Sequence, residues 1–315
     1  MIDITAVGET LIDLSQTDIS DAGIPVYTAF PGGAPANVAV AASKLGTSTA
    51  FIGKVGADAF GALLIDTVRR NGVDADGMIV CDTANTTLAV VSLHENGERS
   101  FSFYRRGFAD TLLTSDEIPD DRLRDTRILH FGSVSLTDEP SRSATLSAVR
   151  RAKAFGAVIS YDPNYRPTLW DNLDEAVAMM RAPLDDVDIL KISDEELPLI
   201  AGTDDPDAGT RILYEQYGVK LVLLTMGAKG AFYRLGEHTG FCEGFAVKVA
   251  DTNGAGDTFL GAFLSGMIRR GIYTPDKLSD DTVRALTVFA NRAASITTSR
   301  SGAIPAMPTL DEVSI

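Results

Sequence analysis

The sequence has few of the features that mark secreted, membrane-spanning or cysteine-ligated metal proteins. Cys81 and Cys242 are its only cysteines in 315 residues, too few for a disulfide framework or a cysteine-rich metal site. It contains no run of about eighteen apolar residues, which a membrane-spanning helix would need, and no N-terminal basic segment followed by an apolar one. These absences predict a soluble protein of a reducing compartment, which we expect to be the cytoplasm.

Positive charge is also scarce. The chain has 28 Lys and Arg against 43 Asp and Glu, a formal net charge of -15, and no basic run offsets this excess. A negative field of this kind argues against nucleic acid or an anionic membrane as a general partner. Any phosphate-bearing ligand must therefore be held by a few local donors.

Several catalytic motifs are missing as well. His94, His130 and His238 do not have the spacing of metal ligands, and no Gly-x-Ser-x-Gly elbow occurs. No P-loop is present, and a dinucleotide fingerprint fails because Phe259 stands where its third glycine should be. Hydride transfer and P-loop chemistry are both disfavoured.

One stretch, residues 250–270, stands out among the features that are present. A strand predicted over 245–249 runs into a turn that holds Gly254 and Gly256, and an apolar helix follows at once. Unpaired N–H groups and the dipole at a helix N-terminus favour an anion. Asp257, in the first turn, is then either an acid that stabilises the dipole or a general base beside a phosphate, and this stretch alone leaves both open.

Alternating strand and helix patterns along the rest of the chain predict one α/β body over residues 1–315. The predicted strands cover 4–8, 10–14, 49–53, 128–134, 158–161, 187–192, 220–225 and 231–235, and the predicted helices cover 35–45, 58–71, 141–155, 173–181, 259–268 and 282–297.

A hairpin interrupts this alternation. Residues 88–93 and 99–104 follow a period of two, and a turn over 95–98 with Asn-Gly at its centre separates them. We expect a small β lid built from about residues 10–30 and 86–110, whose last strand carries Phe103 and Arg105 towards whatever it covers. The alternative is an edge hairpin with solvated arginines.

Each of the polar residues near the N-terminus has two possible roles. Asp13 interrupts an apolar run, so it either faces water at a sheet edge or accepts hydrogen bonds from a bound polyol. Gly32 and Gly33 precede a helix of small residues, and Asn37 in its first turns either caps that helix or is presented to a ligand.

Two further polar groups follow predicted strands. Asp162, Asn164 and Arg166 come after the strand at 158–161, at the end where open parallel sheets bind their ligands. Ser193 and Glu196 have the spacing of a capping box, which is a sufficient structural explanation of both.

Two segments of this chain, PGGAPANVAVAASKLG at 31–46 and DTNGAGDTFLGAF at 251–263, resemble the two signatures of the ribokinase-like (PfkB) carbohydrate kinases, in the expected order. The resemblance covers the chain from end to end. It implies a three-layer α/β/α body with a mostly parallel central sheet, a small β lid, and ATP-dependent phosphorylation of a sugar hydroxyl with Mg²⁺.

The resemblance also implies roles for individual residues. Asp257 would be the general base, and the N–H groups of Gly254, Ala255, Gly256 and Asp257 would form a hole for charge on the transferred phosphoryl group. The positions that match the family's nucleotide site are Lys191, Ser193, Glu196, Thr225, Gly227, Gly230 and Asn291. Glu196 would bind Mg²⁺ through water, and Ser193 departs from the family, which has asparagine there.

A monovalent-cation site is a further implication of the resemblance. Asp251, with carbonyls near Asn253, Thr297, Arg300 and Gly302, matches the site seen in some members of the family. Activation by potassium is therefore a hypothesis for this chain.

The positions that match the family's sugar site are Asp13, Gly32, Gly33, Asn37, Phe103, Arg105, Asn164 and Arg166. The run 99–110 is similar to fructokinases, whereas 160–170 is similar to both fructokinases and 2-keto-3-deoxygluconate kinases. Fructose is therefore the favoured substrate, followed by 2-keto-3-deoxygluconate, then ribose or a nucleoside. A sugar sensor without catalysis is the alternative from another class, and pairing of two lids predicts a homodimer.

Overall fold

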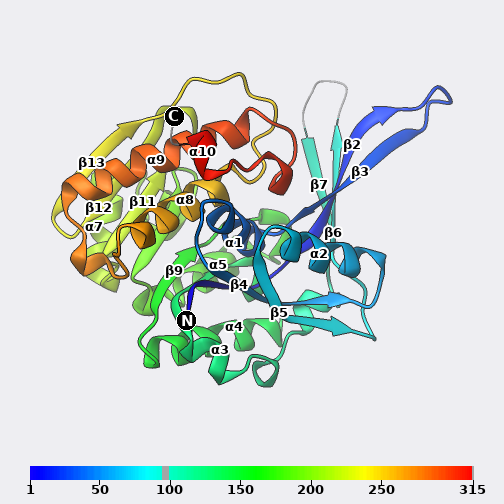
Figure 1. Cartoon of the computed structure of the whole chain (residues 1–315), viewed down its shortest axis with the longest axis horizontal. Coiled ribbons are helices and arrows are strands. Elements are labelled where there is room, and N and C mark those ends of the chain that lie inside the picture. Colours follow the sequence, from blue (N-terminus) through cyan, green and yellow to red (C-terminus); the bar gives the residue numbers. More distant parts are fainter. Residues whose placement is uncertain (94–98, 314–315) are drawn as a thin grey trace.

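The computed structural model describes residues 1–93 and 99–313, and a nine-stranded sheet forms its centre (Figure 1). The strand order is β13-β12-β11-β10-β9-β8-β1-β4-β5, with parallel neighbours from β5 to β11 and antiparallel pairing of β12 and β13. The strands are β1 (Ile2–Val7), β4 (Thr49–Gly56), β5 (Val73–Cys81), β8 (Thr126–Gly132), β9 (Val158–Asp162), β10 (Ile189–Ser193), β11 (Leu221–Thr225), β12 (Gly230–Leu235) and β13 (His238–Glu243).

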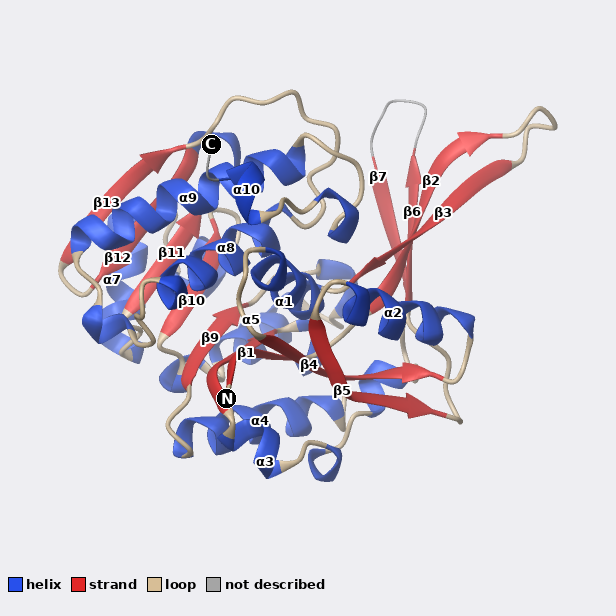
Figure 2. Cartoon of the chain, viewed as in Figure 1, coloured by secondary structure: helices blue, strands red, loops and turns tan. Residues whose placement is uncertain are grey.

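Helices cover both faces of this sheet, which gives the predicted three layers (Figure 2). One face packs against α1 (Ala34–Lys44), α8 (Ala255–Arg269) and α9 (Asp280–Thr298), and the other against α4 (Ser141–Ala154), α5 (Leu173–Arg181) and α7 (Pro206–Tyr217). The remaining helices are α2 (Ala59–Arg70), α3 (Asp120–Arg124), α6 (Leu197–Ala201) and α10 (Leu310–Val313). None of the described helices is long and apolar enough to cross a membrane.

Small residues bring α1 and α8 close together beneath the site. A Cβ added to Gly261 of α8 would lie 2.7 Å from the Cβ of Ala41 in α1, so only glycine permits this approach. Side-chain caps start some of the other helices: Asp58 accepts a hydrogen bond from the Gly61 N–H at α2 (2.8 Å), and Ser279 starts α9 in the same way. The two helices that carry the glycine motifs are thus packed side by side.

A second sheet of four strands projects from the body on the side of α2 (Figure 1). We call it the small sheet. Its order is β3-β2-β6-β7, formed by β2 (Leu11–Ile19), β3 (Pro25–Gly32), β6 (Leu88–Leu93) and β7 (Arg99–Tyr104). The turn predicted over 95–98 falls within residues 94–98, outside the described residues.

Two differences from the predicted elements concern the chain around the site. Residues 245–249, predicted as a strand, form a loop, and Val249 in that loop is 61% exposed. The apolar residues there do not pair with a neighbouring strand, so the strand predicted at 245–249 was wrong. Conversely, β3, β5 and β13 were not predicted as strands; prolines interrupt the pattern of β3, and Asp74, Asp76 and Gly77 interrupt that of β5.

Candidate active site

A cleft forms where the C-terminal ends of β1 and β9 meet the N-termini of α1 and α8 and the base of the small sheet. Its lining residues are Glu9, Leu11, Asp13, Gly33, Ala34, Asn37, Phe103, Val134, Asn164, Arg166, Asn253 and Asp257. The cleft therefore brings together most of the residues predicted for catalysis and sugar binding from four separate parts of the sequence. Glu9, Leu11, Ala34 and Val134 were not predicted.

Asp257 lies in the first turn of α8 and is 8% exposed. Its Oδ2 accepts a hydrogen bond of 2.8 Å from Nδ2 of Asn37, so the two glycine motifs meet through this pair. Burial, together with the charge of Asp162, raises the pKa of Asp257 to about 6 against the effects of Asn37, Lys191 and Arg166. A carboxylate with this pKa is mostly ionised at neutral pH and can still take up a proton.

Glycines at the N-terminus of α8 let neighbouring groups come close to its backbone. Gly254 has φ of +75°, and a Cβ on it would lie 2.9 Å from the Cβ of Ala303. A Cβ on Gly256 would lie 2.9 Å from Nζ of Lys191, so a buried ammonium group rests against this helix start. The Ala255 N–H donates to the Thr252 carbonyl at 3.3 Å, a long bond within the turn. Helix dipole and ammonium together form a positive site suited to phosphate.

Lys191 is paired rather than isolated. Its Nζ lies 2.9 Å from Oδ2 of Asp162, and both side chains are buried. Burial acts to lower the pKa of Lys191, but the carboxylates of Asp162 and Glu196 outweigh burial and raise it. The lysine therefore keeps its charge at the start of α8.

Asp13 and the two glycines before α1 form the opposite wall. Asp13 Oδ2 accepts a hydrogen bond of 3.1 Å from Nδ2 of Asn253, and burial raises the pKa of Asp13 to about 6. A Cβ on Gly32 would lie 2.7 Å from Oδ2 of Asp13. Gly33 has φ of +104°, and its Cβ would lie 2.6 Å from the carbonyl oxygen of Glu9. Gly33 thus requires glycine, whereas a side chain at Gly32 would displace the carboxylate of Asp13.

Arg105 does not line this cleft. Its Nε donates to Asp110 (2.7 Å), and its Nη1 donates to Thr137 and to Asp138. It lines a neighbouring cleft with Trp170, and Phe103 borders both clefts. Among the described residues its Nη2 has no hydrogen-bond partner. The charge of Arg105 is therefore largely committed to acids of the protein.

Asn164 and Arg166 follow β9. Asn164 has a positive φ of 49°, rare outside glycine, and its N–H donates to Asp162 (3.2 Å). Arg166 is exposed and donates to the carbonyl of Tyr165 at 3.1 Å. This loop places an amide and a long cationic side chain at the mouth of the cleft.

Ser193 and Glu196 form the reciprocal hydrogen bonds that their spacing predicts, but within the turn that precedes α6 and not at a helix start. Ser193 N–H donates to Glu196 Oε2 (2.8 Å), and Glu196 N–H donates to Ser193 Oγ (3.3 Å). Glu196 Oε1 also accepts from the Tyr165 N–H at 2.7 Å. The Glu196 carboxylate is thereby fixed in orientation close to Lys191.

The other residues predicted for the nucleotide site border the turn between β11 and β12. Gly227 has φ of +54° and Gly230 of +117°, and Thr225 Oγ1 donates to the Ile192 carbonyl. Asn291 Nδ2 donates to the carbonyls of residues 242 and 243, each at 3.1 Å. These contacts shape the backbone of the turn and anchor α9 to the end of β13.

Asp251 connects two loops at the start of α8. Its Oδ1 accepts from the Asn253 N–H and its Oδ2 from the Gly302 N–H, each at 3.1 Å. Across the described ranges, no group of three or more His, Cys, Asp or Glu side chains could cage a metal ion.

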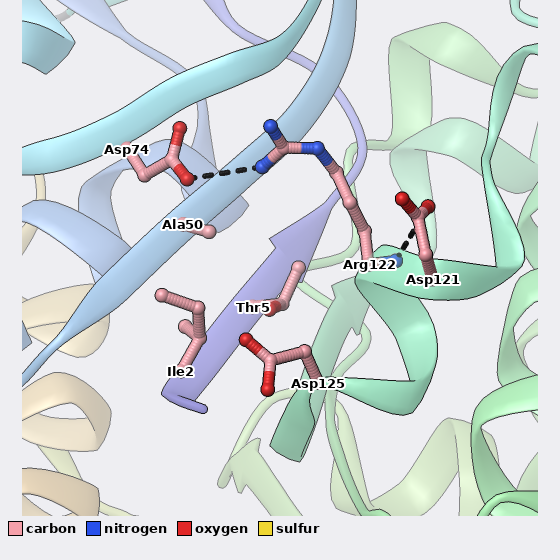
Figure 3. Close-up of a pocket in the computed structure, with 7 residues that line it drawn as sticks. All are labelled: Ile2, Thr5, Ala50, Asp74, Asp121, Arg122 and Asp125. Atoms are coloured by element: carbon pink, nitrogen blue, oxygen red, sulfur yellow. Dashed lines mark hydrogen bonds and ion pairs between the residues drawn. The ribbon is translucent and has the colours of Figure 1, made fainter.

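Another cavity, of about 390 Å³, lies at the opposite edge of the sheet, beside Ile2 and Thr5 at the start of β1 (Figure 3). Arg122 reaches across it to Asp74 at 3.0 Å. Parallel α/β sheets bind ligands at the carboxyl ends of their strands. We therefore place the chemistry in the cleft around Asp257 and not in this cavity.

Comparisons with known proteins agree on one family. The profile of the pfkB family carbohydrate kinases matches residues 1–310. The chain is 42% identical to probable fructokinase-4 of Arabidopsis thaliana over 98% of this chain and 95% of that protein. It is 41% identical to fructokinase-1 of Zea mays over 98% of this chain and 96% of that protein.

Solved structures show the same likeness. The fructokinase of Xylella fastidiosa with bound ATP superimposes with a TM-score of 0.91 at 36% identity, covering 99% of this chain and 96% of that one. A double mutant of the fructokinase of Vibrio cholerae O395, in its fructose, ADP and potassium ion bound form, superimposes with a TM-score of 0.88 at 32% identity. The match covers 99% of this chain and 97% of that one.

Proposed function

This chain belongs to the pfkB family of carbohydrate kinases, and on that premise we propose that it transfers the γ-phosphate of ATP to fructose, giving fructose 6-phosphate. The observation that carries this proposal is the buried Asp257, held by Asn37 at the start of α8 within the cleft. The fructokinases among its relatives support the choice of sugar.

In the proposed reaction Asp257 takes the proton of the sugar hydroxyl as that oxygen bonds to phosphorus. The N–H groups from Gly254 to Asp257 and the ammonium of Lys191 stabilise the charge on the transferred group. As the new bond forms, the bond from the γ-phosphorus to the β–γ bridging oxygen of ATP breaks and ADP leaves; a bound Mg²⁺ would neutralise charge on the phosphates. Asp162 keeps Lys191 in place and charged.

For sugar binding we propose Asp13, Gly32, Gly33, Asn37, Phe103, Asn164 and Arg166. The cleft offers acceptors at Asp13 and at Oδ1 of Asn37, which is buried and has no partner within the described part of the chain. Arg105 lines the neighbouring cleft, so we propose that it contacts the sugar from that side. Its charge is paired with Asp110 and Asp138. An acceptor-rich cleft favours a neutral ketose over a sugar acid.

For the nucleotide we propose the turn that holds Thr225, Gly227 and Gly230, with Ser193 and Asn291 supporting it. The half-exposed apolar side chains of the adjacent loop, Phe245, Val247 and Val249, support this placement because they offer a surface for a base. Glu196 would bind Mg²⁺ through water. Asp251 would support a monovalent cation such as potassium, and equal rates in sodium, potassium and tetramethylammonium would contradict that role.

We further propose that residues 1–315 form one kinase domain whose small sheet acts as a lid and pairs with that of a second copy. Exposed apolar side chains on the small sheet, Ile19, Ile24 and Tyr104, support this pairing. Sedimentation of the full chain as a monomer would contradict it. The proposed location is the cytoplasm, where ATP is available and free thiols such as Cys81 and Cys242 persist.

A coupled ADP-release assay at fixed MgATP tests the function. Fructose, 2-keto-3-deoxygluconate and ribose are compared, and we expect the highest kcat/KM with fructose. A higher value for either competitor would reassign the substrate. Binding of a sugar without any turnover would favour the sensor.

A further inference from the structure

Glu9 is a buried carboxylate that the proposed reaction does not use. It lies between β1 and β2, is 2% exposed, and lines the cleft with Asp13 and Asp257. Its Oε1 accepts a hydrogen bond of 3.1 Å from the N–H of Ala34, the first residue of α1. Its Oε2 is buried and, within residues 1–93 and 99–313, accepts no hydrogen bond. One oxygen therefore caps a helix while the other has no task in the fold.

Buried polar atoms without partners are uncommon, because burial removes the water that would otherwise bind them. Asn37 Oδ1, in the same cleft, is a second such acceptor. Both oxygens can be satisfied by the same kind of ligand, one that brings several hydroxyl donors into the cleft. A polyol has that chemistry.

The charges around Glu9 narrow the class of ligand further. Burial raises the pKa of Glu9 to about 7, and among the neighbouring charges Arg105 lowers this pKa while Asp110 raises it. Arg105 is itself paired with Asp110 and Asp138. Among the residues that line the cleft the cation is Arg166, which is exposed at its mouth, whereas the buried Arg105 beside Glu9 is already paired. At pH 8, where Glu9 and Asp13 are both mostly ionised, a ligand carboxylate placed there would meet two like charges.

We propose that Glu9 is a specificity-determining residue, whose Oε2 accepts a hydrogen bond from a sugar hydroxyl and whose charge rejects sugar acids. This hydroxyl differs from the one that is phosphorylated, because the phosphate would lie at the start of α8, whereas Glu9 caps α1. The inference rests on the proposed sugar kinase activity.

Two substitutions test the role. Glu9→Gln can keep an oxygen on the Ala34 N–H, which places an amide NH₂ where Oε2 was and turns an acceptor into a donor. Glu9→Ala removes both oxygens. The matched control is Asp205→Asn, because Asp205 caps α7 through the Ala208 N–H but does not line the cleft.

We expect the KM for fructose to rise about 10-fold or more in both Glu9 variants, the loss typical of a hydrogen bond to a charged group. The KM for ATP should stay within about two-fold, and the control should keep both values. In Glu9→Gln the kcat/KM for 2-keto-3-deoxygluconate relative to fructose should rise about 10-fold. A deoxyfructose that lacks the hydroxyl bound by Glu9 should lose little further affinity in Glu9→Ala.

The inference is overturned if fructose KM in both variants stays within two-fold of the unmodified chain, or if no deoxyfructose shows coupling to Glu9. Parallel increases in the KM values for ATP and fructose would assign Glu9 to helix capping alone. If Glu9→Ala does not fold, the KM values of Glu9→Gln and of the unmodified chain for the deoxyfructoses decide whether Glu9 binds a sugar hydroxyl. Failure of the unmodified chain to phosphorylate fructose refutes the proposed substrate instead, and the same comparison then uses the sugar that is turned over.

Discussion

Replacing Asp257 by asparagine should impair catalysis and stabilise the fold at the same time. The pKa of this carboxyl is about 6 in the folded chain, against an ordinary value of 3.8. A raised pKa means that the folded chain binds the proton more tightly, so this contribution to stability is present below pH 4 and is lost as the pH rises through 6. At pH 8 the ionised group disfavours folding by on the order of 3 kcal/mol.

An asparagine side chain at this position would stay neutral at every pH, so the variant should escape this penalty. With an unfolding entropy of about 2.1 cal/mol/K per residue, 3 kcal/mol corresponds to a rise in Tm of roughly 4 °C for a chain of this length. Loss of a general base should lower kcat by about 10²- to 10⁴-fold. The amide can still accept the hydrogen bond from Asn37, so the geometry of the site should persist.

Thermal unfolding followed by circular dichroism at pH 8 and pH 4.5, together with kcat at saturating fructose and MgATP, measures both effects. The stabilisation should be large at pH 8 and small at pH 4.5. Asp162→Asn is the control, and it should destabilise the fold instead. It removes the partner of the buried Lys191, which should lower the free energy of unfolding by about 3–5 kcal/mol.

Two results would refute this reasoning. A kcat for Asp257→Asn within tenfold of the unmodified chain would remove the base assignment. An equal change in Tm at both pH values would show that the stabilisation does not come from the ionisation of Asp257.

Three further predictions follow from the same site. The kcat/KM for the sugar should fall as the pH drops below about 7, to roughly a tenth of its plateau or less at pH 5, because Glu9, with a pKa of about 7, and then Asp13 and Asp257, with pKa values of about 6, become protonated; a flat profile from pH 5 to 8 would contradict this. Gly33→Ala should raise the KM for the sugar more than tenfold or prevent folding, since its φ is +104° and a Cβ would lie 2.6 Å from a backbone oxygen. Gly23→Ala, also at positive φ but with open space around it, should cost about 1 kcal/mol and leave the KM unchanged, as melting curves and kinetics would show. Lys191→Met should lower kcat by at least about tenfold through the loss of a charge beside the α8 N-terminus; unchanged single-turnover rates would contradict this role.

Several parts of the molecule could be predicted because their signals are local. Period-two runs at 88–93 and 99–104 match β6 and β7, and the cap spacing of Ser193 and Glu196 matches the hydrogen bonds formed. A turn or a cap depends on neighbouring residues, which the sequence lists side by side. The strand predicted at 245–249 failed because a local pattern cannot supply a pairing partner.

The sequence by itself determined the two glycine motifs, the alternation of strands and helices, and the candidate residues that those motifs carry. Only the tertiary structure decided which side chains meet: Asn37 with Asp257 across 220 positions, Asn253 with Asp13 across 240, and Arg105 with its acids outside the cleft. It also revealed Glu9, which no motif marks. Burial and the pKa values that follow from it depend on segments far apart in the chain, and therefore on how the sheet and helices pack.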